Sequence, residues 1–111
     1  MTKLVVAILI ALMMPARAVD LHSANLVLPG CKGFLDKTSV PAPDEAIMEG
    51  YCVGFLEGLG YTTDFCQPKG VTTNQAVAVV VKYIEARPER MHEDFRALAL
   101  EALIAAWPCK H

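Results

Sequence analysis

The sequence predicts a small all-α domain of four helices stapled by two disulfides. The chain has 111 residues, 54% of them hydrophobic, which is enough for one hydrophobic core and too little for two. Apolar residues recur at helical spacing in several segments. Four cysteines in a short chain with an export signal favour disulfides over free thiols.

The first eighteen residues have the features of a secretory signal peptide. Lys3 precedes an uncharged apolar run from Leu4 to Met14, and the small-residue triplet Ala16-Arg17-Ala18 follows Pro15. The run is far shorter than the roughly 20 residues that span a bilayer, so we expect no membrane anchor. We predict cleavage after Ala18, which divides the chain into a signal peptide (1–18) and an exported helical domain (19–111). The alternative is an uncleaved, buried N-terminal helix.

The charge of the chain argues against a nucleic-acid partner. Ten Lys and Arg residues stand against twelve Asp and Glu, a formal net charge of −2. Lys3 and Arg17 belong to the predicted signal peptide, so the exported domain would hold eight basic and twelve acidic residues, a net of −4. The basic residues are scattered and form no basic patch.

Residues 19–60 predict two helices. The segment 19–35 is apolar but interrupted by Pro29-Gly30, which predicts one short or broken helix. A loop over 36–43 follows. Asp44-Glu45 then begin a helix that ends near Gly60, because acids are favoured in a first turn. Its apolar stripe is Ile47, Tyr51, Phe55 and Leu59, flanked by Met48, Cys52 and Leu56.

Residues 72–107 predict two further helices after a connector at 61–70. Thr72 and Gln75 form a capping-box pattern before the valine-rich run 76–84, whose valines would also suit a strand. The cap, the length and the lack of alternation favour a helix over 72–87, which Pro88 ends. The last helix, 92–107, opens with His92-Glu93-Asp94. Its apolar stripe is Phe95, Leu98, Ala102 and Ala106, with Leu103 and Trp107 beside it.

The last two helices favour one disulfide pairing. Two helices of equal length joined by a short turn should form an antiparallel hairpin, so their outer ends meet. Cys66 precedes the first of these helices and Cys109 follows the second, which leaves Cys31 to pair with Cys52. Four cysteines allow three pairings, and this is the one we expect. Zinc is the competing explanation, but the chain has no Cys-x-x-Cys pair.

Three glycines recur every four residues in the second predicted helix: Gly50, Gly54 and Gly58. Each costs about 1 kcal/mol relative to Ala in a helix interior, so we expect another backbone to pack closely against this face. That backbone belongs either to this chain or to a partner, such as a second copy.

The turn 87–94 is the most charged part of the chain. It is either simply solvated or a rigid projecting tip that binds a partner. His92 with Glu93, and His22 with Ser23, are possible catalytic pairs, but neither has a third orienting group. We therefore expect no enzyme activity, no metal and no cofactor.

Several blocks of the sequence together resemble the Rap/Tai family. They are residues 52–59, 65–75 with Gly70-Val-Thr-x-x-Gln75, 79–92 with Pro88-Glu-Arg-x-His92, and the ending 106–109. These are small periplasmic immunity proteins that neutralise peptidoglycan amidases delivered by type VI secretion. The resemblance covers about residues 31–109. The Pro29-Gly30 break departs from the uninterrupted first helix that the family would have.

The resemblance implies a disulfide-stapled helical inhibitor without catalytic activity, often a homodimer, that blocks the groove of an amidase. In the family, a protruding loop and an adjacent helix bind the enzyme. The residues at that location here are Glu85, Arg87, Glu89, Arg90, His92 and Glu93. The alternative function is that of a periplasmic chaperone-like protein, or of an orphan helical protein without a toxin partner.

Overall fold

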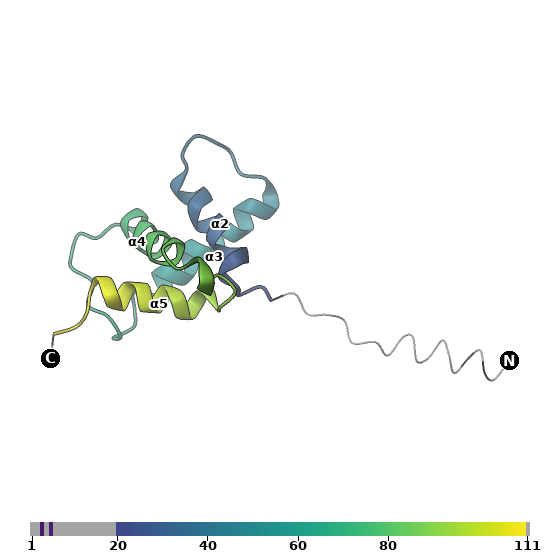
Figure 1. Ribbon diagram of the computed structural model, residues 1–111. Helices are drawn as coiled ribbons and strands as arrows, with labels where there is room; N and C mark the ends of the chain where they lie inside the picture. Colours follow the sequence, from purple (N-terminus) through teal and green to yellow (C-terminus); the bar gives the residue numbers. More distant parts are fainter. Residues whose placement is uncertain (1–2, 4, 6–19, 111) are drawn as a thin grey trace.

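The computed structural model describes residues 3, 5 and 20–110, so the predicted signal peptide and its cleavage position lie outside the described residues, apart from Lys3 and Val5. Residues 20–110 form four α-helices, in order α2 (Ala24–Leu35), α3 (Pro43–Leu59), α4 (Thr73–Glu85) and α5 (Phe95–Ala106), with a short 3-10 helix, η1 (Pro88–Arg90), before the last (Figure 1). Over residues 20–110 the one strand-like pairing is an isolated bridge between Ser23 and Asp94. The predicted all-α fold of four helices is confirmed.

The first helix is continuous where the sequence predicts a break. The side chain of Ser23 caps α2 by accepting a hydrogen bond from the Asn25 amide, and the helix then runs through Pro29 and Gly30. A Cβ on Gly30 would lie 2.5 Å from the carbonyl carbon and oxygen of Met48 in α3. Gly30 is therefore a position of close approach between α2 and α3, and this packing supports the helix despite the missing proline amide.

Three of the four residues of the predicted α3 stripe pack against the core. Tyr51, Phe55 and Leu59 are partly buried there, whereas Ile47 is 70% exposed. The fully buried residues of α3 are Cys52 and Leu56, which the sequence placed beside the stripe. Pro43 begins the helix, and the Ala42 amide donates to Glu45 Oε2 at 3.2 Å, so the expected start is correct to within one residue.

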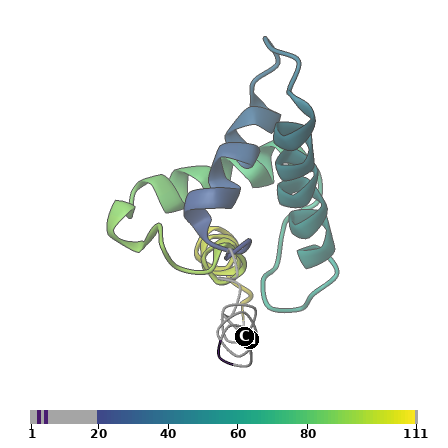
Figure 2. The same ribbon diagram turned by 90° about the vertical axis from the view of Figure 1, so that its right-hand side faces the viewer.

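The last two helices are shorter than predicted and do not form an antiparallel hairpin. Helix α4 stops at Glu85 and α5 starts only after Asp94, whose side chain caps it by accepting from the Arg96 amide. In Figure 1 α5 runs across the view and α4 largely along it, and in Figure 2 the reverse holds, so the two cross at a wide angle. The Thr72 cap is confirmed, because its hydroxyl accepts from the Gln75 amide.

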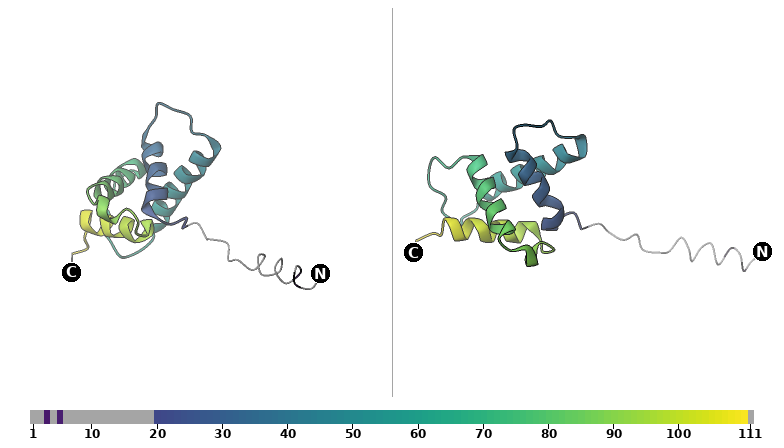
Figure 3. Two further views of the ribbon diagram at one scale, coloured as in Figure 1. Left: turned by 45° about the vertical axis from the view of Figure 1, so that its right-hand side comes forward. Right: turned by 45° about the horizontal axis from the view of Figure 1, so that its top comes forward.

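The hydrophobic core lies among all four helices. Helix α2 packs against α3, α4 packs against α5, and α2 also crosses α4 (Figure 3). Phe95, Ile84 and Leu98 are the largest side chains with almost no exposure. Tyr51 and Phe55 stack on α3, and the Phe55 ring meets the Phe95 ring edge-on at 6.0 Å between centroids. Aromatic contacts therefore join α3 to the start of α5.

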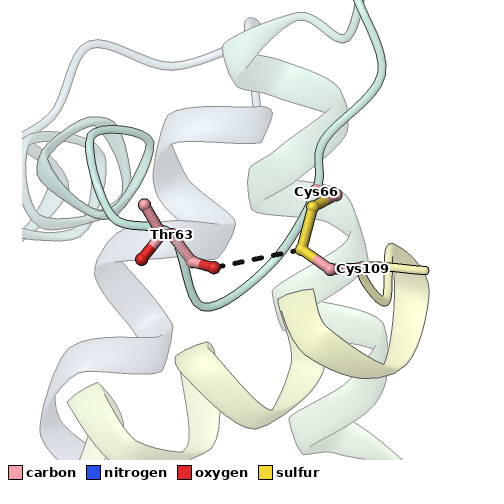
Figure 4. The surroundings of a disulfide bond; sticks show 3 residues. All are labelled: Thr63, Cys66 and Cys109. Atoms are coloured by element: carbon pink, nitrogen blue, oxygen red, sulfur yellow. Dashed lines mark hydrogen bonds between the residues drawn. A yellow bond between two sulfur atoms is a disulfide. The ribbon is translucent and has the colours of Figure 1, made fainter. Parts of the chain in front are cut away.

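Both disulfides form in the predicted pairing. Cys31 and Cys52 join α2 to α3 with 5.4 Å between their Cα atoms, and both residues are fully buried. Cys66 and Cys109 join the connector before α4 to the tail after α5, with 4.9 Å between Cα atoms. In Figure 4 the Cys109 sulfur lies beside the Thr63 carbonyl oxygen, 3.9 Å away. The Cys66 amide also donates to the Trp107 carbonyl at 2.9 Å.

The three repeated glycines do not pack within the chain. A Cβ on Gly50, Gly54 or Gly58 would meet no atom of the described residues within 4 Å, and all three glycines are exposed. Of the two alternatives, packing by another segment of residues 20–110 is therefore wrong, because α2 packs against α3 on another side, where Gly30 meets Met48. None of the described helices has the length and hydropathy of a membrane-spanning segment.

Candidate functional site: the turn between α4 and α5

The turn 87–94 lies at the edge of the molecule, where Figure 2 shows the chain reversing between α4 and α5. The start of α2 holds the second half of this turn. The Ala24 amide donates to the Glu93 carbonyl at 2.9 Å, and the Asn25 amide donates to the Met91 carbonyl at 2.8 Å. In return the Phe95 amide donates to the His22 carbonyl. Residues far apart in sequence thus fix the backbone of the turn.

Arg90 is the centre of an ion-pair network beneath the turn. Its guanidinium donates to both carboxylate oxygens of Glu93 at 2.7 and 2.9 Å, and to both of Glu101 at 2.8 and 3.0 Å. The Tyr83 hydroxyl donates to the same Glu101 carboxylate at 3.2 Å. A bidentate pair with two carboxylates restricts the arginine to one orientation. The network therefore links α4, η1 and α5.

Electrostatics within the network favour the charged forms. Hydrogen bonds from Arg90 lower the pKa of Glu93 and of Glu101, and the same two carboxylates raise the pKa of the Arg90 guanidinium. At the start of α5, hydrogen bonds from Arg96 lower the pKa of Asp94 to about 2. All these groups are partly exposed, so water and salt reduce the energy of each pair.

Two more of the predicted contact residues are also engaged inside the chain. The Arg87 guanidinium lies over the Tyr83 ring at 3.6 Å from the centroid and donates to the Tyr83 carbonyl at 2.8 Å. Glu85 at the end of α4 pairs with Lys32 of α2, with 2.8 Å between Nζ and Oε1. These contacts tie the first residue of the turn to α4, and the end of α4 to α2.

Glu89 and His92 differ from the other four predicted contact residues. Both are exposed, and within residues 20–110 neither side chain makes a hydrogen bond or an ion pair. The six predicted residues thus fall into two groups. Glu85, Arg87, Arg90 and Glu93 brace the turn, whereas Glu89 and His92 present free polar groups on it.

The two possible catalytic pairs have other partners. The His22 ring nitrogen Nδ1 lies 2.9 Å from the Tyr51 hydroxyl, and the Ser23 hydroxyl donates to the Met91 carbonyl. Glu93, the neighbour of His92, is paired with Arg90. The described part of the chain holds no group of three His, Cys, Asp or Glu residues placed to bind a metal ion.

The family model described as Rap1a immunity proteins matches residues 22–109. This match spans the four helices and both disulfides. The chain belongs to the Rap1a immunity protein family. Membership of this family indicates immunity to a secreted effector protein, an extracellular or periplasmic location and, as is general for such proteins, a role without enzymatic activity. No curated protein and no solved structure matches the chain.

The sequence did not reveal several residues of the network in this Rap1a family member. Tyr83 and Glu101 belong to the network around Arg90, but they are seven residues before it and eleven after it. No local pattern connects such positions. The one available signal was that Glu101 is the single acidic residue in α5, whose other residues are apolar apart from Arg96. The contact of residues 22–25 with residues 91–95 had no signal in the sequence, because it depends on how α2 packs.

Proposed function

We propose that this chain is a periplasmic immunity protein that binds and inhibits a peptidoglycan amidase delivered by type VI secretion. The match to the Rap1a family carries the proposal, since it indicates immunity to a secreted effector. The predicted signal peptide (1–18) and two disulfides in a chain of this size support export of the domain 19–111 to the periplasm. The amidase is the target that the resemblance to the Rap/Tai family implies.

We assign the enzyme contact to the turn 87–94, with Glu89 and His92 as the side chains that meet the amidase. Glu85, Arg87, Arg90 and Glu93 would act as positioning residues, because their side chains already bind other parts of the chain. A braced turn loses little conformational freedom on binding, and this favours affinity. The acidic exported domain would also attract a basic enzyme.

We also propose that two copies associate through the open face of α3. Gly50, Gly54 and Gly58 are exposed and present no side chain, so the backbone of a second helix could approach closely there. Replacing Gly54 with Leu would separate the copies. Sedimentation velocity of the oxidised protein tests this, and a wild-type chain that is monomeric at micromolar concentration would contradict it.

A pull-down, followed by an inhibition assay of the captured enzyme, tests the main proposal. Oxidised protein from the periplasm is immobilised, proteins of a periplasmic extract from cells delivering the effector are captured, and each captured hydrolase is assayed on isolated peptidoglycan. We expect an amidase to be recovered and inhibited at one binding site per chain. Glu89→Lys and His92→Ala should each weaken capture about tenfold, a loss typical of a central contact residue.

Lys69→Ala is the matched control, because Lys69 is exposed in the connector before α4, away from the turn. Arg90→Ala should also weaken capture, but with a lower urea midpoint, since it removes the network that braces the turn. Recovery of no amidase, or of many unrelated unfolded proteins, would reject immunity and favour a chaperone-like or orphan role. If Glu89→Lys and His92→Ala both leave the recovery of the amidase unchanged, the contact lies elsewhere on the protein.

A further inference from the structure

An apolar groove of about 540 Å³ lies between α2 and the first half of α3. Leu21, Leu26, Pro29, Ile47 and Met48 supply its apolar lining. Leu21 and Ile47 are 59% and 70% exposed, although both are large aliphatic side chains. A groove of this size is within the range of binding sites for a few large side chains. Its lining is thus a hydrophobic surface that the described chain leaves uncovered.

Carboxylates surround this groove. Asp44, Glu45 and Glu49 are the charged residues that line it, and none of them forms an ion pair within residues 20–110. The wider sequence has the same character. From Thr38 to Pro68 the chain holds five acidic residues, Asp44, Glu45, Glu49, Glu57 and Asp64, and no Lys, Arg or His. The apolar groove therefore has an acidic rim without compensating charge.

We propose that this groove binds a positively charged amphipathic helix of another protein. Apolar side chains on one face of such a helix would fill the groove between Leu26 and Ile47, and flanking Lys or Arg would pair with Asp44, Glu45 and Glu49. A second copy of this chain fits less well, because it would bring the same carboxylates against each other. An anionic membrane surface would likewise be repelled by them.

The groove is separate from the other two surfaces. None of Gly50, Gly54 and Gly58 lines it, and neither does any residue of the turn 87–94. The inference therefore does not rest on the proposed amidase inhibition, and its test uses no amidase.

The test measures binding of a fluorescein-labelled amphipathic Leu/Lys peptide to the oxidised protein by fluorescence anisotropy. A Leu/Glu peptide of the same pattern is the comparison. We expect saturable binding of the Leu/Lys peptide alone, weakened by salt because charge pairs contribute. Ile47→Asp, and the double change Asp44→Lys with Glu49→Lys, should each raise the dissociation constant about tenfold or more.

Ile104→Asp is the matched control, because Ile104 is an exposed aliphatic residue on α5 outside the groove. It should leave binding unchanged, and circular dichroism should show the same helical content in every variant. Absence of binding, equal binding of the Leu/Glu peptide, or equal binding by Ile47→Asp would overturn the proposal. Conversion of a dimer to a monomer by Ile47→Asp would also overturn it, since a second copy would then occupy the groove.

Discussion

Two kinds of glycine on neighbouring helices have opposite roles. Gly30 on α2 faces the backbone of Met48, where no side chain fits. Gly54 on α3 faces open space. The sequence pattern suggests the reverse, because the repeat Gly50, Gly54 and Gly58 is regular and Gly30 follows a proline. Close packing is decided by the partner surface that a glycine meets, and a periodic repeat gives no information about that surface.

Gly30→Ala and Gly54→Ala should therefore change stability in opposite directions. A Cβ at Gly30 would overlap Met48, so we expect a loss of about 1–3 kcal/mol as the helices move apart. Alanine at the exposed position 54 should instead stabilise the helix by about 0.5–1 kcal/mol. Urea unfolding of the two oxidised variants at low protein concentration measures both. Equal losses would show that α3 packs differently from the structure.

Asp94 should make stability depend on acid pH. Its pKa is lowered to about 2 in the folded chain, chiefly by hydrogen bonds from Arg96, and lies near 3.9 when unfolded. Folding then favours the deprotonated form, so this stabilisation is complete above about pH 4 and is lost as pH falls through about 2. Asp94→Asn keeps a capping oxygen but loses the ion pair. Urea unfolding between pH 2 and 5 should give a flatter dependence for this variant, whereas an unchanged slope would contradict the assignment.

At the scale of elements, the turn between α4 and α5 depends on a third helix. Hydrogen bonds from the start of α2 and the Arg90 pairs fix residues 90–95. Local signals placed the ends of α4 and α5 within about two or three residues, because the Thr72 cap and Pro88 act locally. They did not predict the wide crossing of the two helices, because α2 packs against both of them and such contacts leave no local signal.

The two disulfides should be reduced in a fixed order. Cys31 and Cys52 are fully buried, whereas Cys66 is exposed in the connector before α4. A thiolate reductant needs access to a sulfur, so dilute dithiothreitol should open Cys66–Cys109 first. Alkylation followed by peptide mass spectrometry identifies the released thiols. In urea above the unfolding midpoint, both disulfides should be reduced together. Early release of the Cys31 thiol in the native protein would contradict the buried position of Cys31–Cys52.

At the scale of the whole molecule, export and oxidation should determine stability. Each disulfide closes a loop that contributes roughly 3–4 kcal/mol in the chain-entropy model, comparable to the net stability of a small domain. We expect the exported protein to begin at Val19 and to contain no reactive thiol. A chain without residues 1–18 made in the cytoplasm should have reactive thiols and a much lower urea midpoint. Intact mass and urea unfolding test this, and reoxidation in vitro is the control that should restore the midpoint.

Three separate surfaces of the molecule carry the proposals. The turn 87–94 offers free polar groups on a braced backbone, α3 offers an open glycine face, and the α2–α3 groove offers an apolar lining with an acidic rim. Their separation allows each to be changed alone. The family match covers all three surfaces except Leu21 of the groove, but distinguishes none of them.

The sequence by itself determined the helical fold, the use of the four cysteines in disulfides, the capping residue Thr72 and the family. These follow from periodicity, from composition, from local hydrogen bonds and from motifs. The cysteine pairing was also predicted correctly, but from an antiparallel hairpin of the last two helices that the structure does not contain. Only the tertiary structure decided that Gly30 packs while Gly54 is open, that Arg90 joins Glu93 to Glu101, and that residues 22–25 hold the turn. Those facts depend on which surfaces meet in space, and a contact between distant residues leaves no pattern in a single sequence.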